Sequence, residues 1–182
     1  MRSILIGPPG ADKGTQSHKL ADKFAIPHIS IGQLFHESVG TGTILGMAAK
    51  HYLNASDLVP SDLTNALAAD QMSQPDCRRH GFIRDGYPRS LEQAEAVSRT
   101  LAVRDTSTNA ALKFQVREDD LLTRLKRRAR ADDTDEVIHN RLRGYQERTA
   151  PLQAYHHNEL ITIAGVGSID EGFTRVLQAL RR

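Results

Sequence analysis

The sequence predicts an α/β protein: a five-stranded parallel sheet with helices on both faces, which together make a three-layer sandwich. Short apolar runs typical of buried strands recur along the chain, and helical patterns lie between them. Strands that alternate with helices favour a parallel sheet that is covered on both faces. The predicted strands are residues 4–6, 26–29, 82–83, 112–116 and 161–164.

Length and composition fit one domain without a disulfide framework. The chain has 182 residues, enough for a sizeable single core. Its net charge of +2 does not by itself indicate a nucleic acid or a membrane as a partner. Cys77 is the only cysteine, which excludes a cysteine zinc cluster and makes a reducing cytoplasm the expected location. Residues 1–6 have the pattern of a strand rather than a signal peptide, and no long apolar run follows.

The first predicted strand leads into a glycine-rich turn, Gly7-Pro8-Pro9-Gly10-Ala11-Asp12-Lys13-Gly14-Thr15, before a helix over residues 16–24. Strand, glycine-rich turn, lysine and helix is the layout of a phosphate-binding loop (P-loop). The backbone N–H groups of such a loop point at a phosphate, and the helix N-terminus adds positive potential. Lys13 would serve the β- and γ-phosphates and Thr15 would lie near Mg²⁺. A glycine-rich turn that binds nothing is the alternative.

Asp12 departs from the general P-loop pattern, which has glycine immediately before the lysine. A carboxylate loses the conformational freedom of glycine and faces a polyanion. Two unit charges about 4 Å apart repel by about 1 kcal/mol in water and about 4 kcal/mol at an effective dielectric of 20. We therefore expect Asp12 to weaken phosphate binding.

Residues 30–60 form a predicted helical excursion between two strands. Gly40-Thr41-Gly42 breaks the helical pattern, a helix is expected over 43–54, and Ser61 is the expected cap of the helix that follows. A helical flap beside a phosphate loop is well placed to hold a second substrate. A structural insertion without a ligand is the alternative.

Residues 82–89 are the second informative stretch. Asp85 ends a predicted strand, where an acidic residue near a phosphate loop can hold Mg²⁺ through water. Gly86 belongs to the exit turn, and Arg89 offers a bidentate clamp for a phosphate. The alternative is an ordinary turn with a surface arginine. Arg84 is unexpected, because a parallel strand is normally apolar on both faces; it would reach a carboxylate or line the cleft.

Capping boxes are predicted at three helix starts. Ser90 with Gln93, Asp133 with Glu136, and Ser168 with Glu171 have the required spacing. For Gln93, the capping role competes with a role in reading a base. The second pair would start a long helix from 134 to about 157. The third would start the final helix after the turn that contains Gly167.

A predicted helix over 118–130 is basic, and three interpretations of it compete. Lys126 and Arg127 fit a solvated charged face. A nucleic-acid patch lacks the interleaved aromatic residues and any recognised motif. A phosphate clamp would require Arg128, Arg130 and Arg141 to converge across the hairpin.

Five stretches, taken in order, resemble the adenylate kinases, in particular the bacterial form with a short lid. The resemblance extends over essentially the whole chain. The residues that carry it are Gly7-Pro8-Pro9-Gly10-Ala11 with Lys13-Gly14-Thr15-Gln16, Ile26-Pro27-His28-Ile29-Ser30, Asp85-Gly86-Tyr87-Pro88-Arg89 with Gln93, Arg128 with Arg130-Ala131-Asp132-Asp133, and Thr149-Ala150-Pro151-Leu152.

The resemblance implies the reaction ATP + AMP ⇌ 2 ADP in a monomeric cytoplasmic enzyme, with Mg²⁺ on ATP and no nucleic acid or membrane partner. Within one P-loop kinase domain, 30–60 would be the AMP-binding flap and about 127–134 a short lid, too short for the zinc cysteines of longer lids. The implied catalytic residues are Lys13, Arg89, Arg128, Arg130 and Arg141. The implied ATP-binding residues are Gly10, Ala11, Asp12, Lys13, Gly14, Thr15, Arg124, Arg128 and Gly167. The implied AMP-binding residues are Ile31, His36, Asp57, Leu58, Val59, Gly86, Arg89, Gln93, Arg130 and Arg141, and Asp85 would organise Mg²⁺ through water.

Several residues depart from the family pattern at the site itself. Asp12 replaces a glycine, Ile31 a threonine, Gln33 an acidic residue and His36 an arginine that grips the AMP phosphate. Arg84, Arg127 and Ala129 depart in the same way from an apolar residue and two glycines. We therefore expect weakened activity. The alternatives are a catalytically dead nucleotide-binding protein of the same fold and a kinase for another nucleoside monophosphate.

Overall fold

One parallel sheet organises the molecule. The computed structural model describes residues 1–54, 59–128 and 134–181. Within these ranges, five strands pair in the order β2-β3-β1-β4-β5, and every pairing is parallel. The strands are β1 (Arg2–Ile6), β2 (His28–Ser30), β3 (Phe82–Asp85), β4 (Ala110–Gln115) and β5 (Leu160–Ala164). The predicted α/β fold is confirmed, and each predicted strand is present with its ends shifted by a few residues.

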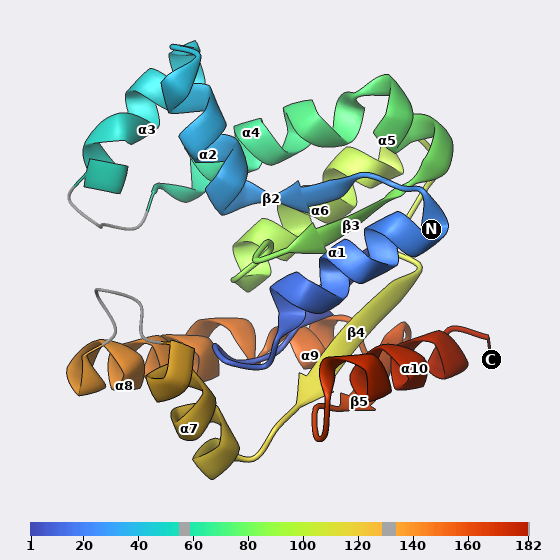
Figure 1. The fold of residues 1–182 in the computed structure, drawn as a ribbon. Helices are drawn as coiled ribbons and strands as arrows, with labels where there is room; N and C mark the ends of the chain where they lie inside the picture. Colours follow the sequence, from blue (N-terminus) through green and yellow to red (C-terminus); the bar gives the residue numbers. More distant parts are fainter. Residues whose placement is uncertain (55–58, 129–133, 182) are drawn as a thin grey trace.

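Two helices cover one face of the sheet. They are α1 (Lys13–Phe24) and α10 (Ile169–Ala179), which lie side by side in front of the strands (Figure 1). The apolar cluster under them includes Leu5, Leu20, Leu112 and Val176. Ser168 caps α10 through the predicted capping box with Glu171. The apolar side chains of α10, among them Phe173 and Leu177, pack against this cluster.

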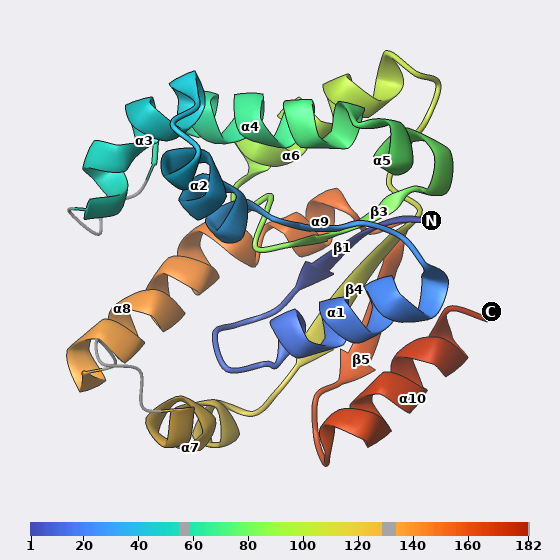
Figure 2. The ribbon, with the colours of Figure 1, turned by 45° about the horizontal axis from the view of Figure 1, so that its top comes forward.

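The opposite face carries α6 (Leu91–Ala102) and the short α9 (Leu152–Tyr155), which lie behind the strands (Figure 2). Because both faces are covered, successive strand residues such as Ile4, Leu5 and Ile6 are all buried. The first strand lies at the centre of the sheet. The loop that follows it therefore starts in the middle of the carboxyl edge of the strands. Ligands of parallel sheets bind at that edge.

The helix expected from 134 to about 157 is not continuous. It consists of α8 (Asp135–Gly144), a π-helical turn (Tyr145–Thr149) and α9. Pro151 lies between the last two segments and lacks the N–H that a continuous helix requires. Thr134, rather than Asp133, is the N-cap, and its hydroxyl accepts from the N–H of Val137. Asp133 itself lies outside the described residues.

The excursion after β2 forms four helices: α2 (Ile31–Gly40), α3 (Ile44–Asn54), α4 (Ser61–Ser73) and α5 (Pro75–His80). The predicted break after Gly40 is confirmed. The prediction that Ser61 caps α4 is wrong, because Pro60 occupies the N-cap position and Ser61 is the first helical residue.

The helix after β4 is α7 (Glu118–Arg128), and the next helix in the chain is α8. None of the described helices is long and apolar enough to cross a membrane.

Arg84 neither reaches a carboxylate nor lines the cleft, which corrects the expectation for it. Its side chain is fully buried, and its Nη2 donates to Thr108 Oγ1 at 2.6 Å. Its guanidinium carbon lies 5.8 Å from the centre of the Phe82 ring. Among the described residues, Nε and Nη1 find no hydrogen-bond acceptor. Desolvation lowers the pKa of Arg84 to about 10.

Candidate functional site

The glycine-rich turn forms a tight loop between β1 and α1. Gly10 has a φ of +83°, and a Cβ there would lie 3.1 Å from Leu125 Cγ. Left-handed backbone and close packing together explain the glycine at this position. Lys13 begins α1, and its Nζ donates to the carbonyl of Pro8 at 2.9 Å. The ammonium group therefore folds back onto the loop that precedes α1.

Asp12 also lies in the left-handed region, with a φ of +55°. Aspartate tolerates this conformation better than most residues because its short side chain can bond locally. Here the carboxylate pairs with a residue of α7: Oδ2 lies 3.2 Å from Arg124 Nη1. Arg124 also donates from Nη2 to the carbonyl of Gly165 at 2.8 Å. Any effect of Asp12 on phosphate binding therefore also involves Arg124, its ion-pair partner.

A small cavity of about 20 Å³ lies beside this ion pair. Its lining includes Asp12, Arg124, Gly167 and Arg175. Arg175 reaches back from α10, and its Nε donates to the carbonyl of Ala164 at 2.9 Å. Sequence reasoning missed Arg175. Its position on the exposed side of an amphipathic helix gave no signal that it would fold over the loop after β5.

Asp85 lies close to the phosphate loop. It ends β3 opposite Leu5 of β1, and its Oδ2 is 3.4 Å from the place where a Cβ on Gly14 would stand. His28 Nε2 lies 3.9 Å from the same carboxylate oxygen and 3.0 Å from Ser17 Oγ. Desolvation, followed by the proximity of His18, lowers the pKa of His28, and Asp85 acts in the opposite direction. The sequence predicted a role in Mg²⁺ binding for Asp85 and none for His28.

The donor set around Asp85 fits a magnesium ion that is carried mainly by a nucleotide. In the described ranges, no group of three or more histidine, cysteine or acidic residues could hold a metal without help. Mg²⁺ commonly uses one or two carboxylates together with substrate phosphates and water. Asp85 and the hydroxyl of Thr15 could supply the protein's share.

The turn after β3 places Arg89 next to Asp85. Gly86 has a φ of +73°, and its carbonyl accepts from Arg89 Nε at 2.7 Å. Gln93 Oε1 accepts from the backbone N–H of Arg89 at 2.8 Å, and Ser90 Oγ accepts from the N–H of Gln93 at 3.3 Å. Only half of the predicted capping box is present, because the Gln93 side chain bonds one residue before the cap. Thr149 Oγ1 donates to the carbonyl of Arg89 at 3.0 Å, a contact that sequence reasoning missed.

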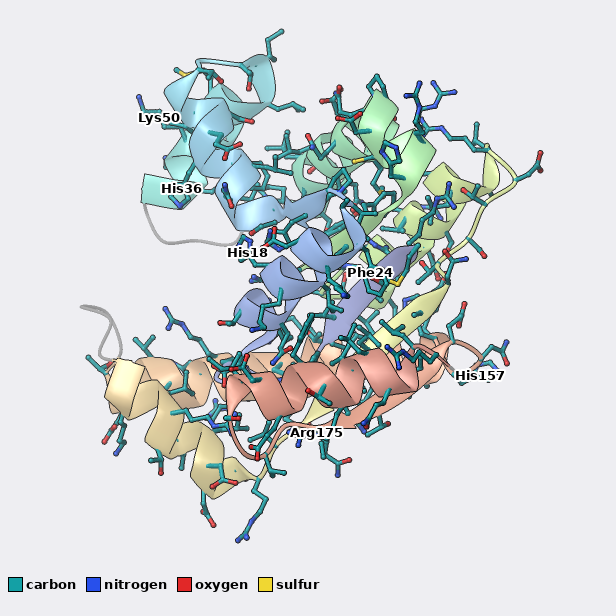
Figure 3. All side chains as sticks on the ribbon, turned by 45° about the vertical axis from the view of Figure 1, so that its right-hand side comes forward. His18, Phe24, His36, Lys50, His157 and Arg175 are labelled. Atoms are coloured by element: carbon teal, nitrogen blue, oxygen red, sulfur yellow. The ribbon has the colours of Figure 1, made fainter. Side chains whose placement is uncertain are left out.

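The remaining predicted residues are divided between the two sides of the site. His36 is exposed on α2, across the molecule from Arg175 on α10 (Figure 3). Ile31 is 6% exposed and packs into the apolar cluster shared by α2 and α4, with Val59 against its edge. Arg141 lies on α8, partly buried. Asp57, Leu58 and Arg130 lie outside the described residues, and so does the side chain of Arg128 at the end of α7.

Similarity to known proteins identifies the family of this chain. The family model described as adenylate kinase matches residues 5–161. An adenylate kinase of Mycolicibacterium smegmatis is 57% identical over 180 residues, which is 99% of each chain. One of Mycobacterium sp. (strain MCS) is 57% identical over 182 residues, the full length of both, and one of Mycobacterium tuberculosis is 55% identical over 180 residues.

The chain belongs to the adenylate kinase family. The resemblance predicted from the five sequence stretches is thereby confirmed, and so is the predicted enzyme class, a phosphotransferase. As an adenylate kinase, the chain carries its phosphate loop, Asp85 and Arg89 at one edge of the sheet. Asp12 and His36, which are expected to depart from the family pattern, lie apart: Asp12 pairs with Arg124 of α7, and His36 is on α2.

Proposed function

We propose that this adenylate kinase transfers the γ-phosphoryl group of ATP to AMP, with ATP on the phosphate loop and AMP between the flap and the Gly86–Gln93 turn. The observation that carries the proposal is that the loop that ends in Lys13 and the turn from Asp85 to Arg89 both follow the carboxyl ends of neighbouring strands, β1 and β3. Asp85 Oδ2 comes close to Gly14, and Arg89 folds over the turn that Asp85 begins. Two phosphate groups facing each other would be held by these residues.

Electrostatic stabilisation and positioning supply the catalysis. Phosphoryl transfer passes through a loose transition state with charge on the peripheral oxygens, so no covalent nucleophile is required. Lys13 would give up its hydrogen bond to the Pro8 carbonyl and bind the β- and γ-phosphates instead. Arg89 holds the acceptor phosphate. Three further arginines neutralise the charge of the phosphoryl group during transfer: Arg128, Arg130 and Arg141. Mg²⁺ bound with ATP would supply further charge neutralisation, and Asp85 would help to hold it through water.

Closure completes the site. In the proposal, residues 30–60 form the AMP-binding flap and about 127–134 the lid, both within one domain. Closing them excludes water, which would otherwise hydrolyse ATP. The flap and α7 stand on opposite sides of the phosphate loop (Figure 1). The partners are ATP, AMP and ADP, and we expect a cytoplasmic monomer without structural zinc, nucleic acid or membrane.

The same geometry predicts a weakened enzyme. Arg124, expected to pack on the adenine of ATP, is paired with Asp12 and with the Gly165 carbonyl. ATP must break the ion pair or bind around it. On the other side, His36 offers the AMP phosphate an imidazole in place of a guanidinium, which can donate two parallel hydrogen bonds to a phosphate.

A catalytically dead nucleotide-binding protein is the second candidate, and the Asp12–Arg124 pair favours it. Formation of ADP from Mg-ATP and AMP distinguishes the two. We expect measurable ADP formation in the parent and a loss of at least about a hundredfold in Lys13→Met, because a buried phosphate would lose its charge partner. CMP, UMP and GMP offered in place of AMP should react more slowly. Binding of ATP without any ADP formation would establish the dead protein instead.

A further inference from the structure

Hydrogen bonds from near and far along the chain hold Arg89, the residue that the proposed function places on the acceptor phosphate. Its backbone N–H donates to Gln93 Oε1 at 2.8 Å, and its Nε donates to the Gly86 carbonyl at 2.7 Å. Both partners belong to the same short turn. The carbonyl of Arg89, in contrast, accepts from Thr149 Oγ1 at 3.0 Å, across 60 positions of sequence. Thr149 therefore ties the turn to a distant segment.

The segment that carries Thr149 is the π-helical turn after α8. The turn closes through the N–H of Ala150, which donates to the Tyr145 carbonyl at 2.9 Å. The Tyr145 side chain packs against the apolar cluster around Ile4, so the start of the turn is anchored on the sheet. π-helical turns within helices are frequent at functional sites. Here the turn ends on the residue that bonds to Arg89.

Arg141 lies on the same helical segment as Thr149. It belongs to the last turn of α8, and α8 passes directly into the π-helical turn. In the proposed function, Arg89 holds the acceptor phosphate and Arg141 neutralises the phosphoryl group during transfer. The bond from Thr149 to Arg89 thus joins the two elements that carry these arginines.

We propose that Thr149 is a positioning residue for the AMP side of the reaction. Its hydroxyl holds the backbone of Arg89 and thereby fixes the place of the Arg89 guanidinium relative to Arg141. The inference rests on the proposed function, which assigns the AMP phosphate to Arg89. A displacement of about 1 Å in such a contact can cost about a hundredfold in rate, so the loss of one hydroxyl has a measurable effect.

Thr149→Val removes the hydroxyl and keeps the branched shape of the side chain. Binding of AMP and of ATP is measured by calorimetry, and ADP formation by initial rates. In Thr149→Val, the dissociation constant for AMP should rise about fivefold and kcat should fall about tenfold, while the dissociation constant for ATP stays within about twofold of the parent. Thr149→Ser retains the hydroxyl and should stay within about twofold of the parent in all three constants.

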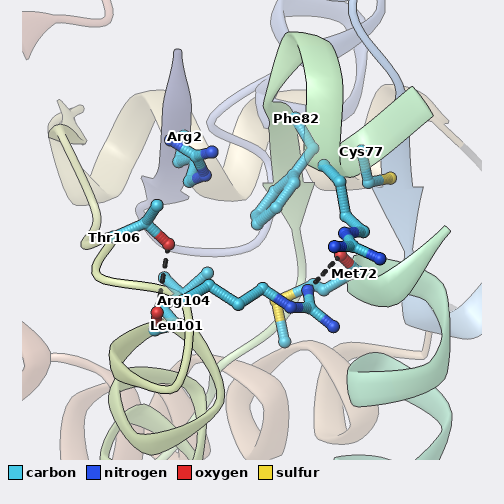
Figure 4. A pocket seen from close by; sticks show the side chains of 8 residues that line it. Arg2, Met72, Cys77, Phe82, Leu101, Arg104 and Thr106 are labelled. Atoms are coloured by element: carbon cyan, nitrogen blue, oxygen red, sulfur yellow. Dashed lines mark hydrogen bonds between the residues drawn. The ribbon is translucent and has the colours of Figure 1, made fainter. Parts of the chain in front are cut away.

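A matched control lies at the other end of α6, the helix that follows the Arg89 turn. Thr106 Oγ1 donates to the Leu101 carbonyl at 3.1 Å (Figure 4), and Thr106 is partly buried, as Thr149 is. Thr106→Val therefore removes the same kind of bond, from a threonine hydroxyl to a backbone carbonyl. It should leave AMP affinity and kcat within about twofold of the parent.

A double-mutant cycle tests whether Thr149 acts through Arg89. Thr149→Val is compared with the parent and then introduced into Arg89→Gln. In the Arg89→Gln background, it should change the dissociation constant for AMP by less than about twofold, because no guanidinium is left to position. An effect as large as in the parent would overturn the proposal.

Other results would overturn it as well: Thr149→Ser as impaired as Thr149→Val, equal weakening for AMP and ATP, or no binding of AMP to the parent. Calorimetry does not require turnover, so it separates this inference from the proposed function. If AMP binding depends on Thr149 as predicted but the parent forms no ADP, the positioning role stands and the proposed activity fails. If ADP forms and Thr149→Val matches the parent, the activity stands and the positioning role fails.

Discussion

Asp12 Oδ2 and Arg124 Nη1 lie 3.2 Å apart, although 112 residues separate them in the chain. The pair joins the phosphate loop to α7. It is partly exposed, with 45% of the Asp12 side chain and 22% of the Arg124 side chain accessible. Such pairs contribute little to stability, about 0–1 kcal/mol. Its proposed consequence is therefore for ATP, because Arg124 is expected to bind ATP and Asp12 holds its side chain.

Replacing Asp12 by asparagine should tighten ATP binding. Asparagine tolerates the left-handed backbone at this position but cannot form the ion pair. We expect the dissociation constant for ATP to fall by about three- to tenfold, equivalent to about 0.7–1.4 kcal/mol, measured by calorimetry. Asp22→Asn removes the same charge from the exposed end of α1 and should leave ATP affinity unchanged. Equal affinities in parent and Asp12→Asn would show that the pair does not oppose ATP.

The histidine at position 36 predicts a selective defect for AMP. His36→Arg would place a guanidinium on the exposed side of α2, where it could form paired hydrogen bonds with the AMP phosphate. The KM for AMP should fall by about tenfold, while the KM for ATP changes by less than about twofold. Initial-rate kinetics with each substrate varied in turn measure both.

His51→Arg provides the matched control, because it adds the same group at an exposed position on α3. It should leave both constants unchanged. Equal changes in the two KM values for His36→Arg would remove position 36 from the AMP site.

Arg84 predicts a stabilising substitution. Its buried guanidinium has one protein acceptor, Thr108, and two unsatisfied groups among the described residues. Replacing buried charges by apolar groups of similar size is often neutral or stabilising by about 1–4 kcal/mol. Arg84→Met should therefore raise the free energy of unfolding by about 1 kcal/mol in denaturant titrations. A loss of more than about 1 kcal/mol would mean that Arg84 has partners that this geometry lacks.

Stability should fall on the acid side because His156 is buried and His28 is partly buried. Desolvation lowers the pKa of His28 and of His156, and Arg84 lowers that of His156 further. The unfolded chain then binds more protons than the folded one below about pH 6.5, so the free energy of unfolding decreases as the pH falls through that value. Above it, both histidines are neutral in either state and this contribution does not change.

Denaturant titrations at several pH values between about 7.5 and 5 test this. The loss on acidification should be smaller in His28→Gln than in the parent, because one depressed imidazole is removed. The same slope in both proteins would exclude His28 as a source of the acid sensitivity.

The fold was predictable because its signals are local. Apolar runs such as Ile4-Leu5-Ile6 predict strands that are buried on both faces. The capping box of Ser168 and Glu171 sets a helix start through contacts between neighbouring residues alone. Ser61 and Asp133 show the limit of such signals. Several polar residues stand near each of those helix starts, and the backbone decides which of them becomes the cap.

The site was predictable only where a motif carries its own geometry. Lys13, Asp85 and Arg89 belong to short stretches that fold locally and follow the carboxyl ends of β1 and β3. The direction of the Asp12 carboxylate depends on Arg124, and that of Arg84 depends on Thr108, both of which come from distant segments. Local sequence does not contain those contacts, so the repulsion expected at Asp12 and the carboxylate partner expected for Arg84 could not be checked before the fold was known.

The most direct test is a coupled assay of ADP formation from Mg-ATP and AMP, run on the parent and on Asp12→Gly. Glycine adopts the left-handed backbone without strain. It also lacks the carboxylate, so Arg124 is released from the ion pair. We predict activity in both proteins, with a KM for ATP that is about tenfold lower in Asp12→Gly and a KM for AMP that is nearly unchanged. Absence of ADP formation in both proteins, with ATP still bound, would contradict the proposed activity and leave a nucleotide-binding protein of the adenylate kinase family.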